Sequence, residues 1–199
     1  MSIESSRGVT LVELVVFMVV IGIALAMFVA FNTIVAGSPN PEVRKQVLAI
    51  AESLLEEAEL MAFTYCDAND ANAATAANSG GCALATNSED GAPLGPKTIP
   101  VLGTETRYST TVPFNNVMHY NGFSMGSGIF DITSGGVTPV TGLSAYSASL
   151  VVTQVNLGSG GDQIASPEAL NIAVTVTGPG GVSITLEGYR TRYAPNTTP

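Results

Sequence analysis

Residues 7–36 read RGVTLVELVVFMVVIGIALAMFVAFNTIVA, and most of this run carries no charge. No charged residue occurs between Leu14 and Ala36, and only Gly22 interrupts the apolar side chains of residues 14–31. A helix of about 20 apolar residues suffices to cross a bilayer. The run therefore predicts a membrane-spanning helix. A cleaved secretory signal is the alternative, although its apolar core has only about 7–15 residues.

The composition of the whole chain limits what it can be. Its 199 residues are 46% hydrophobic and 12% charged, so disorder of the whole chain is excluded. With 7 basic and 16 acidic residues the net charge is −9, which argues against a nucleic-acid partner. The mean hydropathy of +0.35 is high for a soluble domain, and the apolar run accounts for the excess. The chain is long enough for one domain with an appendage.

The two cysteines indicate in which cellular compartment the C-terminal part of the chain lies. Cys66 and Cys82 both follow the apolar run. Joined, they would close a short loop, worth about 3 kcal/mol in the chain-entropy model. A disulfide requires an oxidising compartment, which would place the C-terminal part outside the cytoplasm. Two free cysteines are the alternative. Basic residues on both sides of the span leave its orientation open by charge alone.

A second helix is predicted after the apolar run. Residues 37–41 (GSPNP) interrupt the first helix, and Asn40 before Pro41 is typical of a helix restart. From Pro41 to Phe63 apolar side chains recur at steps of three and four, which indicates an amphipathic helix with one face to bury. That stripe consists of Val43, Val47, Ile50, Leu54, Ala58 and Met61. The acidic run Glu56–Glu59 is interpreted as a solvated face of this helix.

The remainder of the chain is predicted to be a loop followed by β-structure. Residues 64–97 are rich in Asn, Ala, Gly and Ser and show no periodicity. Residues 146–153 alternate between apolar and polar, as do 172–177 and 182–186. The last two runs flank Gly178–Gly181, which predicts a β-hairpin. An antiparallel sheet with one apolar face would pack on the amphipathic helix, so the fold class is α+β.

The sequence gives little support for a metal site or a catalytic site. The segment Cys66–Asn72 clusters oxygen ligands, but it lacks the spaced glycine and terminal glutamate of an EF-hand loop, so a solvated loop is expected. His119 is the only histidine and is expected at the surface or as a hydrogen-bonded residue of the domain. We therefore expect no metal, no cofactor and no enzymatic activity.

The string Arg7–Leu14 carries the strongest local signal. Glu13 is the only charged residue between Val9 and Pro41, and it stands at the start of the apolar helix. A carboxylate in a membrane helix is costly unless it is paired, and it suggests a function. The alternative is an acid at the interface, stabilised by the helix dipole.

The whole string resembles the processing site of type IV prepilins and pseudopilins. In that family a short polar leader ends in glycine, and the mature chain begins with phenylalanine, threonine, leucine, an apolar residue and glutamate. Here Gly8 matches the end of the leader, Thr10 and Leu11 match, and Glu13 matches the glutamate. Val9 departs from the pattern, since phenylalanine is usual there.

The resemblance implies a mechanism and a layout. Prepilin peptidase would cut between Gly8 and Val9 and methylate the new α-amino group of Val9, and the leader would hold the N-terminus inside. Glu13 would pair with the N-terminus of a neighbouring subunit. The implied fold is type IV pilin-like, with a long N-terminal helix whose first half is transmembrane, packed on a small antiparallel sheet. The implied parts are a leader (1–8), an assembly helix (9–36), an amphipathic helix (37–63) and a β-rich extracytoplasmic domain (64–199).

Residues 44–63, Tyr120–Gly122 and Gly188–Thr191 further resemble MshD-like minor pilins of the MSHA (mannose-sensitive haemagglutinin) pilus system. This implies a structural minor pilin for assembly, initiation or capping of the pilus. The implied partners are other pilin subunits, prepilin peptidase, the pilus assembly platform and the bacterial inner membrane. The domain would face the periplasm before reaching the pilus or cell surface. The alternatives are a minor pseudopilin of type II secretion and a single-pass anchored binding domain that does not polymerise.

Overall fold

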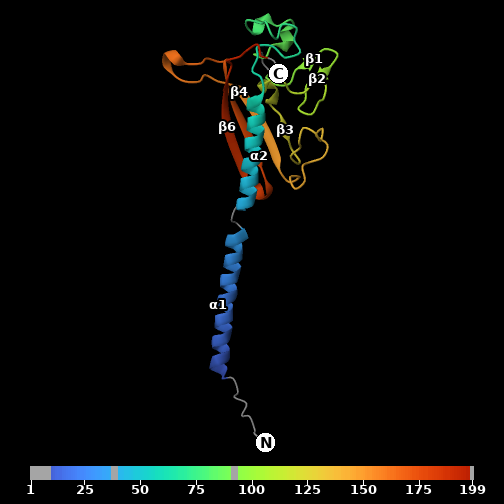
Figure 1. Ribbon diagram of the computed structural model, residues 1–199. Helices are drawn as coiled ribbons and strands as arrows, with labels where there is room; N and C mark the ends of the chain where they lie inside the picture. The colour runs from blue at the N-terminus through green and yellow to red at the C-terminus, as the bar shows by residue number, and fades with distance from the viewer. Residues whose placement is uncertain (1–9, 37–39, 91–93, 198–199) are drawn as a thin grey trace. The chain divides into compact units, whose positions relative to one another are not determined.

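The computed structural model describes residues 10–36, 40–90 and 94–197. The chain divides into two compact units, Met1–Asn40 and Pro41–Pro199 (Figure 1). Gly8 and Val9, the expected cleavage site, lie outside the described residues, and so does the turn at 37–39. The architecture is α+β, with an apolar N-terminal helix and small antiparallel sheets.

The first unit contains the apolar helix α1, Leu11–Ala36, which runs uninterrupted through Gly22. Its segment Leu11–Val29 is long and apolar enough to cross a membrane. The apolar side chains of this segment are exposed, since the unit has no other described element to cover them. The helix is apolar on all sides, unlike a surface helix of a globular domain. This is the surface that lipid or other apolar helices would cover.

The second unit is built on helix α2, Pro41–Leu60, which begins with proline at its first position, as predicted. The predicted stripe is confirmed: Val47, Leu54 and Ala58 are buried, with Ala51 beside them. The helix ends at Leu60 and not at Phe63. Beyond it, the carbonyl of Ala62 accepts a hydrogen bond from the Val117 N–H, and that pairing draws the chain out of the helical path.

The main sheet is antiparallel and has the order β3-β4-β5-β6. Its strands are β3 (Ser124–Met125), β4 (Ser147–Gln154), β5 (Ala169–Thr177) and β6 (Ser183–Thr191). The predicted hairpin is confirmed, since Thr177 pairs with Ser183 across the short 3-10 turn Pro179–Gly181. A separate two-stranded sheet pairs β1 (Thr98–Ile99) with β2 (Gly103–Thr104).

Helix α2 packs on β5 and β6 and closes one core with the sheet (Figure 1). The strands alternate over the predicted runs, where the buried side chains are Ala148, Leu150 and Val152 on β4 and Ile172, Val174 and Val176 on β5. Two glycines permit the close approach of helix and sheet. A Cβ on Gly178 would lie 2.8 Å from Val47 Cγ2, and one on Gly188 would overlap Glu59.

Candidate functional site

Thr10 and Glu13 together build the start of α1. The Thr10 hydroxyl accepts a hydrogen bond from the Glu13 N–H at 3.3 Å, and the Thr10 carbonyl accepts the first helical bond from Leu14 at 3.1 Å. Threonine followed three residues later by glutamate is the capping-box spacing. The pair thus begins the helix and places one carboxylate at its positive end.

The Glu13 side chain is exposed and stands among exposed apolar neighbours. Leu11 and Val12 are 80% and 69% exposed. No other residue of α1 is charged. The first turn of the apolar helix thus carries a single carboxylate. A carboxylate in lipid requires a cationic partner. The described residues begin at Thr10, so they show the carboxylate and not the predicted N-terminus.

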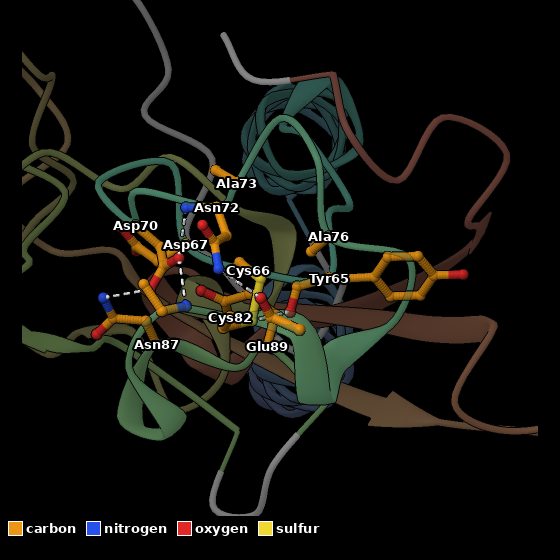
Figure 2. The surroundings of a disulfide bond; sticks show 12 residues. Tyr65, Cys66, Asp67, Asp70, Asn72, Ala73, Ala76, Cys82, Asn87 and Glu89 are labelled. Atoms are coloured by element: carbon orange, nitrogen blue, oxygen red, sulfur yellow. Dashed lines mark hydrogen bonds between the residues drawn. A yellow bond between two sulfur atoms is a disulfide. The ribbon is translucent and has the colours of Figure 1, made fainter.

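The disulfide predicted from the cysteine pair is present between Cys66 and Cys82 (Figure 2). Cys66 is fully buried and forms a small apolar cluster with Ala73 and Ala76, against which Tyr65 and Cys82 pack. The bridge closes the segment that was expected to be a solvated loop. That expectation is wrong for the two aspartates of the segment, Asp67 and Asp70, which are buried.

The buried Asp70 carboxylate accepts hydrogen bonds from N–H groups of the protein in place of water. One carboxylate oxygen accepts from the backbone of Asn72 and Ala83, and the other from the backbone of Leu84 and the Asn87 amide. Burial alone would raise the pKa of Asp70, but these hydrogen bonds outweigh it and hold the pKa below its usual value. The aspartate therefore organises the disulfide loop as an internal anchor (Figure 2).

Replacing both Cys66 and Cys82 by alanine should lower the free energy of unfolding by about 3 kcal/mol, because the unfolded chain regains the entropy of an open loop. Urea unfolding of the full-length chain in detergent measures this. Wild-type chain kept reduced serves as the control and should show the same loss. Equal stability of the variant and the oxidised wild type would contradict the prediction.

A buried charged cluster adjoins the disulfide loop through Asp67. His119, in the 3-10 helix η3 (Val117–Tyr120), is fully buried, which decides between the two positions expected for it. Its Nε2 lies 3.0 Å from Glu89 Oε1 and 3.7 Å from Asp67 Oδ2, and its Nδ1 lies 3.1 Å from Glu105 Oε2. All three carboxylates are at most 1% exposed.

Glu105 is an acid of this cluster with a strongly raised pKa. Burial raises its pKa to about 9, and the nearby Asp67 and Glu89 carboxylates act in the same direction. The backbone N–H of Lys97 and the Asn115 amide donate to it at 3.0 and 2.9 Å. Sequence reasoning missed Glu89 and Glu105, because they reach His119 from irregular segments without a shared spacing.

Glu57, in the acidic run of α2, is also not a solvated residue. Its carboxylate accepts two hydrogen bonds from the Arg107 guanidinium and one from the Tyr120 hydroxyl, each 2.7 Å long. Burial alone would raise the Glu57 pKa, but these bonds and the charge of Arg107 hold it below its usual value. The expectation of a solvated acidic face is therefore wrong at Glu57, whereas Glu56 is exposed.

In comparisons with family models, curated proteins and solved structures, none matches this chain. A function must therefore be argued from its own residues. The head of α1 offers a single carboxylate on an apolar helix that is exposed over Leu11–Val29, and the described part of the second unit offers a disulfide and several buried ionisable side chains.

Proposed function

We propose that this chain is a type IV pilin-like subunit that is anchored by α1 and incorporated into a filament through Glu13. One observation carries the proposal: a threonine-capped apolar helix, exposed over Leu11–Val29, bears a single carboxylate in its first turn. That helix follows a short polar segment ending in Gly8.

Two features of α1 explain how it would be incorporated: its exposed apolar side chains and the Glu13 carboxylate. Its apolar side chains need lipid, and in a filament the α1 helices of neighbouring subunits would cover them. Glu13 needs a cation, and cleavage after Gly8 would create one, the α-amino group of Val9. The carboxylate of one subunit would then meet the amino group of the next, which sets the assembly register. An ion pair formed only in the assembled state penalises wrong registers.

The second unit suits the extracytoplasmic side of such a subunit. Its disulfide is of the kind that persists in oxidising compartments. The inner membrane, prepilin peptidase, the assembly platform and other pilin subunits are the proposed partners. Within the family we favour a minor pilin of the MSHA type, with a structural and non-enzymatic role. A minor pseudopilin of type II secretion would have the same anchor and carboxylate.

The mass of the mature chain tests this proposal directly. We expect a chain that begins with N-methylated Val9 in cells with prepilin peptidase, and the intact precursor in cells without it. A Gly8→Asp variant should remain uncut, whereas Ser6→Ala, in the same leader, should be processed normally. An intact Met1 in peptidase-containing cells, or a cut near residue 25, would refute the proposal and favour an anchored domain or a secretory signal.

A further inference from the structure

Three side chains of the buried cluster are spaced as the ligands of one ion. A ligand atom from each of Asp67, Glu105 and His119 lies within 4.8 Å of the other two. All three residues are buried, and each comes from a different part of the fold. Metal–ligand bonds of about 2.0–2.2 Å would span this spacing after a small closure.

Two carboxylate oxygens of the cluster lack hydrogen-bond donors. Asp67 Oδ1 accepts from the backbone and side chain of Asn69, but Asp67 Oδ2 has no donor among the described residues. Glu89 Oε2 also has none, and its nearest cation, Lys97 Nζ, is 4.0 Å away. Buried polar atoms are almost always paired, so each exception needs an explanation. Asp67 Oδ2 lies 3.7 Å from His119 Nε2 and is buried from solvent.

If all three carboxylates of the cluster are ionised, its charges do not balance without a further cation. With a neutral histidine, three carboxylates face one ammonium group, that of Lys97, which leaves two negative charges uncompensated. A buried charge is costly unless it is paired or binds a metal. A divalent cation supplies the missing two charges. Protonation of the carboxylates is the competing way to remove them.

The surroundings of His119 match those of a metal-binding histidine. If Nε2 carries the proton, it donates to Glu89 Oε1 at 3.0 Å and leaves the Nδ1 lone pair facing Glu105 Oε2 at 3.1 Å. Metal-binding histidines usually donate their second ring N–H to a carboxylate in this way. The backbone N–H of Asn115 donates to Nδ1 at 3.4 Å, and zinc would have to displace this long hydrogen bond.

We propose that Asp67, Glu105 and His119 bind one Zn²⁺ ion, with Glu89 positioning the histidine. An imidazole nitrogen among carboxylates suits zinc, whereas calcium and magnesium prefer oxygen ligands alone. The site is structural, because its residues are buried and give a substrate no access. It ties the disulfide loop, through Asp67, to the segment after β2 and to η3.

Zinc titration of the full-length chain in detergent, stripped with a chelator, tests the proposal. We expect one zinc per chain, a higher unfolding temperature with zinc, and no comparable rise with calcium. Removal of zinc by chelator should reverse the rise. A stripped chain that takes up no zinc would overturn the proposal and leave protonation as the means of neutralising the cluster.

Single substitutions then locate the ion. Asp67→Asn and His119→Gln should weaken zinc binding at least about tenfold, and Glu89→Gln roughly ten- to hundredfold. Asp162→Asn removes the same charge from an exposed position and should leave binding unchanged. Zinc binding that is equal in all four variants would place the ion elsewhere and overturn the site. Should a variant fail to fold, Co²⁺ added to the stripped wild-type chain should give a visible absorption band that zinc removes, and the absence of that band counts against the site.

Discussion

Replacing Glu13 by alanine should abolish incorporation of the chain into filaments while leaving its membrane insertion intact. The expectation rests on the proposed pilin-like role. Insertion depends on the apolar length of α1, which the substitution does not shorten. Incorporation depends on the ion pair, and removing one partner of a buried pair costs about 3–5 kcal/mol. That corresponds to a loss of more than about 100-fold in the assembly equilibrium.

Immunoblots of sheared filaments and of membranes measure the two pools separately. Glu52→Ala is the matched control, because it removes an exposed acid from α2 and should not reduce the filament fraction. Recovery of Glu13→Ala in filaments at the wild-type level would contradict the assembly role of the carboxylate. Normal processing at Val9 together with normal assembly of this variant would leave the family assignment standing and remove only the pairing.

The elements predicted correctly are those whose signal is local. The apolar run predicts α1, steps of three and four predict α2, and alternation predicts β4, β5 and β6. The patterns of α2 and of the strands record which face of one element is buried, as Val47 and Leu54 do on α2 and Val174 does on β5. Such periodicity needs no knowledge of what lies opposite.

The features that were missed depend on contacts between irregular segments. The segment from Cys66 onward has no periodicity, yet Asp67 and Asp70 are buried because backbone and side-chain groups of the same segment donate to them. Glu89 and Glu105 reach His119 from separate loops, so no spacing in the sequence relates them. A polar segment therefore forms a solvated loop only when its own backbone does not supply the hydrogen bonds that water would otherwise make to its side chains.

Replacing Arg107 by methionine should lower the free energy of unfolding by about 3–5 kcal/mol, because it leaves the Glu57 carboxylate without its cation in a largely buried position. The side chains of the pair are only 6% and 17% exposed, so water replaces little of the lost interaction. The guanidinium also donates to the Phe130 carbonyl at 2.9 Å and lies over the rings of Tyr108 and Phe123. It thus joins α2 to three other segments of the domain.

The pH dependence of this loss separates the charge effect from lost packing. In the wild type the Glu57 pKa lies below its unfolded value, so its contribution is present above the unfolded pKa and disappears as pH falls through the folded one. In Arg107→Met only burial and the Tyr120 hydroxyl remain, and burial raises the Glu57 pKa. The variant should then lose stability as pH rises through the normal glutamate range. Urea unfolding should therefore show a larger difference between the two chains at pH 7 than at pH 4.

The double variant Glu57→Gln with Arg107→Met also removes the unpaired Glu57 carboxylate. It should recover part of the free energy of unfolding that Arg107→Met loses. A pH-independent difference would mean that Arg107 acts through packing alone.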